Sequence, residues 1–214
     1  MKTPHKGFTL VEIAIVLVII GLLLGGILKG QEMITQAKIK NVIADMSGVS
    51  AAMYGYQDRY RALPGDDKGA NRWGLTVPVT AGNGTIEGKW TETGTEALSF
   101  WDHLRRSGFV SGTGAENPFN AVSGKMGVQT GDGAGDGALG EAANTKLFSG
   151  LILCSGNLPD KVAISVDAQM DDGLGKTGSV RALKAGGAPD LPAKGAADDY
   201  IEDGVSFYTV CRQM

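Results

Sequence analysis

Residues 7–28 read GFTLVEIAIVLVIIGLLLGGIL, and this stretch decides how the rest of the chain is organised. From Phe8 to Leu28 the only charged side chain is that of Glu12. A helix rises about 1.5 Å per residue, so a helix over this run is long enough to cross a hydrocarbon core of about 30 Å. The pattern therefore predicts a membrane-spanning helix over residues 8–30 that contains one acid.

Glu12 is the energetically costly residue of this helix. A carboxylate inside a membrane-spanning helix costs about 2.5 kcal/mol or more, so it needs a partner and is a functional candidate. No other side chain from Phe8 to Leu28 is polar enough to be that partner. We therefore expect the partner to come from outside the run.

The segment Lys6–Glu12, KGFTLVE, resembles the cleavage and methylation motif of type IV pilins and type II secretion pseudopilins. The resemblance implies that residues 1–7 are a leader, which a prepilin peptidase removes after Gly7. Phe8 would then become the N-methylated first residue, and Glu12 the fifth residue, on which subunit assembly depends. In a filament core, the α-amino group of a neighbouring subunit would neutralise the buried Glu12 carboxylate.

A secretory signal and a plain membrane anchor are the alternatives for this N-terminus. A secretory signal is cleaved after its apolar region, which is about 7–15 residues long. Here the expected cut precedes the apolar run and leaves it on the mature protein. This order favours the pilin-like interpretation.

Length and charge set the frame for the rest of the chain. With 214 residues, 43% of them hydrophobic, it has room for one membrane helix and one soluble domain. A net charge of −3 gives no electrostatic case for nucleic-acid binding over the whole chain. The leader carries the positive residues Lys2, His5 and Lys6, so the positive-inside rule predicts that the leader is cytoplasmic and that the head lies outside. Lys29, beyond the apolar run, argues weakly for the opposite orientation.

The helical pattern continues after the apolar run. Over residues 31–60, apolar residues recur at three- and four-residue steps beside a polar face, which predicts the amphipathic second half of the same helix. Pro64 ends the pattern. The alternative is two helices with a break at the glycines between the halves.

Four glycines lie near the junction of these halves: Gly21, Gly25, Gly26 and Gly30. Each costs up to about 1 kcal/mol of helix propensity relative to alanine, so they are candidates for local loss of helix during filament assembly. The sequence departs from many pilins in having no proline here. Close helix packing at small residues is the alternative role.

The two cysteines, Cys154 and Cys211, lie in the part assigned to the oxidising side of the membrane. A disulfide between them is therefore expected, with two buried thiols as the alternative. In the resembled family such a bond commonly closes a C-terminal loop of the head.

Residues 61–214 are expected to form the globular head. Residues 95–109 have the apolar spacing of a helix, which also carries His103 as a packed or surface residue. Short β-like runs follow at 147–154, 162–166, 179–183 and 205–211. The predicted fold class is α+β and pilin-like, with the long N-terminal helix packed on a small antiparallel sheet and a disulfide-closed C-terminal loop.

Aspartates in glycine-rich turns raise the question of a bound cation. Asp132 and Asp136 are candidate calcium ligands, but Ala134 stands where an EF-hand loop needs a ligand. A second acidic cluster, Asp167, Asp171 and Asp172, does not fit that template either. Solvated turns are the favoured interpretation, and no other cofactor is expected.

No pattern of catalytic residues is present, and no phosphate-binding glycine loop or nucleophile elbow occurs. We therefore expect a structural subunit of a type IV pilus or similar filament, held first in the inner membrane as a single-pass precursor. Its expected partners are related subunits, the prepilin peptidase, an assembly platform and the membrane. The alternatives are a type II secretion pseudopilin in a periplasmic pseudopilus, and a minor pilin with an adhesive or DNA-binding head. A basic aromatic patch would mark such a head, and its local candidates are Arg59, Arg61, Arg72, Arg105 and Arg106.

Overall fold

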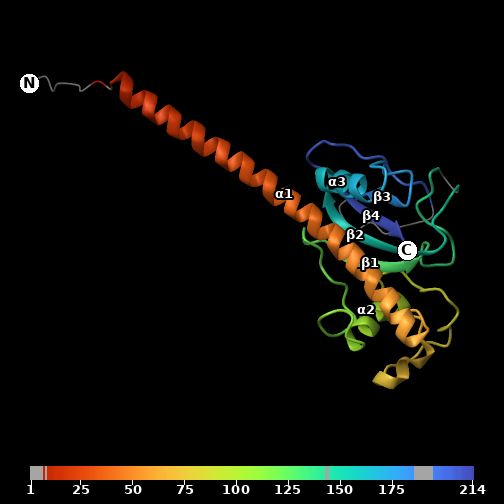
Figure 1. The fold of residues 1–214 in the computed structure, drawn as a ribbon. Helices are drawn as coiled ribbons and strands as arrows, with labels where there is room; N and C mark the ends of the chain where they lie inside the picture. The colour runs from red at the N-terminus through yellow and green to blue at the C-terminus, as the bar shows by residue number, and fades with distance from the viewer. Residues whose placement is uncertain (1–6, 8, 143–144, 186–194) are drawn as a thin grey trace, which may run out of the picture. The chain divides into compact units, whose positions relative to one another are not determined.

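A computed structural model describes residues 7, 9–142, 145–185 and 195–214. The chain divides into two units, residues 1–37 and residues 38–214 (Figure 1). Helix α1 (Leu10–Tyr60) contributes residues to both units. The prediction of one uninterrupted helix through the glycines is confirmed for the single chain.

The second unit contains a four-stranded sheet formed by β1 (Met126–Thr130), β2 (Leu151–Pro159), β3 (Val180–Lys184) and β4 (Phe207–Gln213). The strands lie in the order β1-β2-β4-β3, and every neighbouring pair is antiparallel. The predicted antiparallel sheet is therefore confirmed. The pairing of β2 with β4 is interrupted between Ser155 and Leu158, where the register shifts.

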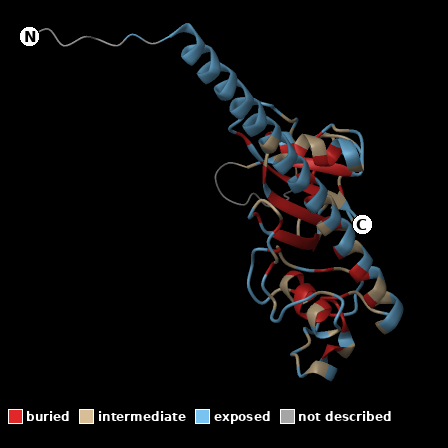
Figure 2. Cartoon of the chain, turned by 60° about the vertical axis from the view of Figure 1, so that its left-hand side comes forward, coloured by how far each residue is buried: buried red, intermediate tan, exposed pale blue. Residues whose placement is uncertain are grey.

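The main core lies between one face of this sheet and the second half of α1, and helices α2 (Glu96–Arg106) and α3 (Asp160–Met170) add side chains to it. Figure 2 shows the buried positions in red along the strands and the lower part of α1. The α1 side chains in this core recur every three or four residues and so share one face. They are Ile39, Val42, Met46, Val49, Ala52, Met53 and Tyr56.

One expected strand is wrong, because residues 162–166 lie inside helix α3. The apolar residues Val162, Ile164 and Val166 alternate as in a strand, but a short apolar run fits either structure. In the fold, Val162 and Val166 are one helical turn apart and both are buried, whereas Ile164 is half-buried.

Other boundaries also differ from expectation. The strand expected at 147–154 is observed as β2, which starts at Leu151 and runs on to Pro159. Strand β1 was not predicted at all. Its sequence, MGVQT, contains a glycine, and glycine weakens the β pattern.

Candidate functional site

The candidate site begins at the N-terminal motif. Gly7, after which the leader is expected to be cut, is exposed. Phe8, the expected first residue and methylation position, lies outside the described residues, as do residues 1–6. The geometry of the motif is therefore described from Thr9 onward.

Thr9 and Glu12 form a reciprocal cap at the start of α1. The backbone N–H and the hydroxyl of Thr9 both donate to Glu12 Oε2, each at 2.7 Å. In return, the Glu12 N–H donates to Thr9 Oγ1 at 3.3 Å. This is a capping box, in which two helix-start N–H groups that lack an intrahelical partner are satisfied by side chains.

This cap corrects the expectation that no polar group in the run partners Glu12. The partner in the single chain is Thr9, one turn before it. The signal was present in the sequence as T-x-x-E before an apolar run, which is the capping-box pattern. Glu12 is thus both a helix cap and the one acid of the apolar helix.

The apolar part of α1 is uncovered in the single chain. From Leu10 to Leu28, every leucine, valine and isoleucine is between 46% and 87% exposed. Among the described residues, α1 is the one helix long and apolar enough to cross a membrane. A continuous apolar surface of this size marks contact with lipid or with other protein.

The four junction glycines all lie within α1, and a Cβ added at any of them would meet no atom within 4 Å other than those of the adjacent residues and the surrounding helix backbone. In the single chain they therefore support no close packing. They stay candidates for loss of helix in a filament, and filament geometry is what tests that prediction.

The predicted disulfide between Cys154 and Cys211 is confirmed. The two cysteines face each other across β2 and β4, with Cα atoms 4.0 Å apart, and both are fully buried. The bond therefore links two neighbouring strands and closes a long C-terminal loop, with a sequence separation of 57.

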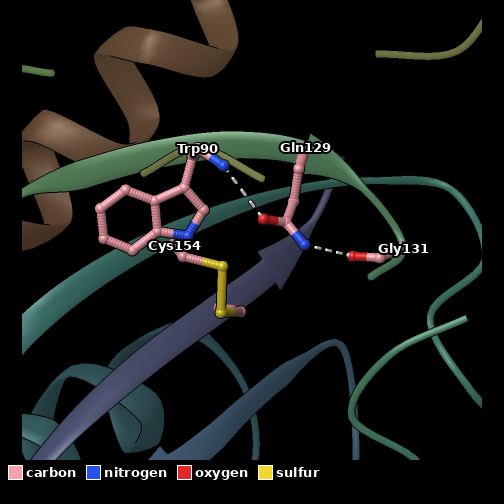
Figure 3. Close-up of a disulfide and its surroundings, with 5 residues drawn as sticks. Trp90, Gln129, Gly131 and Cys154 are labelled. Carbon is pink, nitrogen blue, oxygen red and sulfur yellow. Dashed lines mark hydrogen bonds between the residues drawn. A yellow bond between two sulfur atoms is a disulfide. The ribbon is translucent and has the colours of Figure 1, made fainter. Parts of the chain in front are cut away.

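Trp90 lies beside this disulfide (Figure 3). Its indole occupies the space where a side chain at Gly127 would be, and Gly127 pairs directly with Cys154. The backbone N–H of Trp90 donates to Gln129 Oε1 at 3.4 Å, and Gln129 Nε2 donates to the Gly131 carbonyl at 2.8 Å. The glycine in β1 is thus explained by the tryptophan that packs on it.

A polar cluster at the C-terminal end of α1 was not found from the sequence. The Tyr56 hydroxyl donates to Asp67 Oδ2 at 2.5 Å, and the Arg72 guanidinium forms an ion pair with the same carboxylate. Arg72 also lies 4.5 Å from the ring centroids of both Tyr60 and Trp73. Burial, together with the Asp67 carboxylate, raises the pKa of Tyr56 well above its ordinary value. The cluster joins the end of α1 to the 3₁₀ helix η1 (Lys68–Trp73), whose N-cap is Asp67.

His103 packs beside this cluster. Its Nδ1 accepts a hydrogen bond from the Gly65 N–H at 2.9 Å, and its ring stacks on Tyr56 at an interplanar angle of 13°. Burial lowers the pKa of His103, which favours the neutral ring that can accept this bond. The residue is a packed histidine, as expected.

The five arginines considered for a basic patch each have a partner within the chain. The partners are the ring of Tyr60 for Arg59, Asp58 for Arg61, Asp67 for Arg72, the carbonyls of Gly114 and Glu116 for Arg105, and Asp102 for Arg106. Arg61, Arg72 and Arg106 are thus paired with a carboxylate, whereas Arg59 and Arg105 contact neutral groups.

The acidic turns have their own internal hydrogen bonds. Asp132 Oδ1 accepts the N–H groups of Ala134 and Asp136, at 2.9 and 3.0 Å. The second cluster brings Asp167, Asp171 and Asp172 within reach of a common ion. Asp167 already accepts hydrogen bonds there from Tyr200 and Gly173. The bonds at Asp132 and the bond from Gly173 are local turn contacts, whereas the bond from Tyr200 joins two segments that are distant in the sequence.

Comparison with known proteins adds one family match. Residues 2–28 match the family described as the prokaryotic N-terminal methylation motif. A search of curated proteins finds no match. Among solved structures, the major type IV pilin PilA1 from Clostridium difficile is similar at 14% identity, with a TM-score of 0.35, over 83% of this chain and 96% of that one. Because the identity and the TM-score are both low, this likeness carries no argument, and the N-terminal motif is the feature of this chain that the comparisons identify.

Proposed function

We propose that this chain, whose N-terminus matches the prokaryotic methylation motif, is a structural subunit of a type IV pilus or a related filament. One observation carries the proposal: residues 10–28, which lie within the match to the methylation motif, form a helix in which every leucine, isoleucine and valine is exposed. Such a helix needs a lipid environment first and the helices of other subunits afterwards. The proposed role is structural and includes no catalysis.

The proposed maturation follows from the order of residues in the motif. The precursor is held in the inner membrane with its head outside the cytoplasm, and the prepilin peptidase cuts after Gly7. Phe8 is then the methylated N-terminus, and an assembly platform moves the subunit into the filament. Because the cut precedes the apolar run, the mature protein keeps the helix that packs in the filament.

Glu12 has two successive partners in this scheme. In the single chain its carboxylate accepts two hydrogen bonds from Thr9. In the filament, the α-amino group of a neighbouring subunit supplies a positive charge to the same carboxylate. An ion pair offsets the cost of burying each charge alone, so it also selects the register between two subunits.

Two substitutions separate these roles of Glu12. Glu12→Gln keeps the capping pattern, because glutamine serves at this position of a capping box, but removes the charge. Glu12→Ala removes both. If the charge sets the register, both variants insert and are processed normally but yield few filaments in electron micrographs of sheared cells. Wild-type filament yield from Glu12→Gln would contradict the ion-pair role and leave Glu12 as a cap.

Leader removal has its own test. Gly7→Ala should accumulate the uncleaved precursor, which runs more slowly on a gel than the mature chain, whereas the wild type should be processed. A mature band of normal size from Gly7→Ala would contradict the proposed cleavage site.

A type II secretion pseudopilin is the alternative within the same structural class, since the motif is shared by both. Immunogold labelling of surface filaments supports the pilus, whereas loss of secreted enzymes on deletion, without surface filaments, supports the pseudopilus. No cofactor enters either version. Calorimetric titration of the protein with calcium tests that point, because a bound ion would release or absorb heat and raise the melting temperature.

A further inference from the structure

A groove with an apolar lining lies at one end of the sheet, where β2, β4 and the end of β3 meet residues 119–125. We call it the basic groove. Three large apolar side chains in its lining are exposed to solvent: Phe119 is 67%, Val205 75% and Phe207 42% exposed. Three large apolar side chains gathered at one groove indicate a contact surface.

Two lysines give the groove its charge. Lys125 and Lys184 both line it and are both exposed. Among the residues that the structure describes, no carboxylate lies within ion-pair distance of either lysine, although the charge of Lys184 also acts on the nearby Asp203 carboxylate. The two lysines still leave the groove with a net positive charge. The groove therefore fits an apolar side chain that is flanked by acids.

The same chain presents such a group in the turn after α3, residues 171–174, which we call the Leu174 turn. Leu174 is 59% exposed, and it follows the exposed acids Asp171 and Asp172. The Thr177 hydroxyl donates to Asp172 at 2.6 Å and the Leu174 N–H at 2.9 Å. These bonds hold the pKa of Asp172 below its ordinary value, so the turn is anionic at neutral pH.

The groove and the turn lie at opposite ends of the sheet. At the groove end, Pro159 pairs with Phe207, and β3 ends at Lys184. The Leu174 turn is at the other end, because Asp171 accepts the N–H groups of Ser179 and Val180, where β3 begins. One subunit therefore does not close its own groove with this turn, but a second subunit placed end to end presents it there.

We propose that the Leu174 turn of one subunit docks in the basic groove of the next. Leu174 enters between Phe119 and Phe207, while Asp171 and Asp172 face Lys125 and Lys184. A contact between two different patches of identical subunits is heterologous, and when its rotation does not close a ring it propagates into a filament. This inference names the partner of the head in the proposed filament and so rests on the proposed function.

Site-specific photo-cross-linking in assembled filaments tests the contact. The full chain carries Leu174→p-benzoylphenylalanine, and filaments sheared from cells are irradiated and analysed by mass spectrometry. The expected product is a covalent dimer joined from position 174 to the peptide that holds Phe119 or Phe207. The same photoreactive residue at Val79, which is fully exposed, is the control and should give no groove product.

A second variant tests the charge pairing. Lys184→Glu in the Leu174 photoprobe background places like charges together and should lower the dimer yield by about fivefold or more. Filaments that cross-link from position 174 to another surface, or not at all, would overturn this inference and leave the proposed function standing. A wild type that forms no filaments under any condition would instead overturn the proposed function, and the docking contact with it.

Discussion

The two halves of α1 are parts of one helix that meet opposite surroundings. In the first half, apolar side chains point in all directions and each large one is at least 46% exposed. In the second half, apolar residues share one face, and Ile39, Val42 and Met46 are at most 1% exposed. The second half is covered by the chain's own head, whereas the first half needs cover from outside the chain. The buried side chains of the second half therefore stabilise the folded head. The exposed side chains of the first half are left to contact lipid or other subunits.

The largest expected effect comes from separating the two units. A fragment of residues 38–214 keeps the whole core stripe of α1 and loses the exposed apolar run. We expect it to be soluble and to unfold cooperatively without detergent, while the full chain partitions into membranes or micelles. Thermal circular dichroism and sedimentation measure both properties. An aggregated fragment without a thermal transition would mean that the head depends on the apolar half.

A matched pair of methionines tests the same contrast at single residues. Met46 is fully buried and Met33 is 65% exposed. We expect Met46→Ala to lower the free energy of unfolding of the head by about 2–5 kcal/mol, because it leaves a cavity in the core. Met33→Ala should change it by less than about 0.5 kcal/mol. Urea unfolding of the full chain in detergent, followed by near-ultraviolet circular dichroism, measures both, and equal effects would refute the contrast.

The disulfide should stabilise the head without affecting the apolar half. Replacing both Cys154 and Cys211 by alanine should lower the free energy of unfolding by about 2–4 kcal/mol, because the bond limits the unfolded chain. Membrane insertion of the precursor should be unchanged. Urea unfolding and membrane fractionation give the two readouts, and a loss of insertion would show that the halves are coupled.

A smaller effect is expected at the end of α1. Tyr56→Phe removes the hydrogen bond to the buried Asp67 carboxylate and should cost about 1–2 kcal/mol. Tyr54→Phe, at a neighbouring tyrosine that is 55% exposed, is the control and should be close to neutral. Similar melting temperatures for the two variants would mean that the polar cluster adds no stability.

The smallest expected effect is a pH dependence from Asp167. Burial raises the pKa of this carboxyl, so the folded state binds its proton more tightly than the unfolded chain does. The stability it contributes is complete below the unfolded pKa and is lost as the pH rises through the raised folded pKa. The melting temperature of the wild type relative to Asp167→Asn should therefore rise from about pH 7 to about pH 4. A difference that stays constant with pH would exclude this linkage.

Local sequence patterns were enough for several features of the fold. The single acid in a long apolar run, the helical spacing beyond it and Pro64 predicted α1 to its observed end at Tyr60. The two cysteines predicted their own bond, because a chain expected to lie on the oxidising side of the membrane has only one possible pairing of two cysteines. The helix depends on residues that are close in the sequence, and the disulfide depends on the number of cysteines. Neither prediction needed the tertiary structure.

Other features depend on contacts between distant residues. The run at 162–166 fits a strand or a helix equally well, and its packing in the core selected the helix. Strand β1 has a glycine at position 127 that argues against a strand until Trp90, far earlier in the chain, is packed against it. Tyr56 and Asp67 likewise form their pair only once the chain turns back after α1.

The sequence by itself determined which half of α1 must find cover elsewhere, because hydrophobic periodicity is a local property of the chain. It also contained the Thr9–Glu12 cap, as a T-x-x-E pattern before an apolar run. Tertiary structure alone decided where the head places its surfaces. The basic groove and the Leu174 turn lie at opposite ends of one sheet because antiparallel pairing, which acts between distant segments, sets where each strand begins and ends.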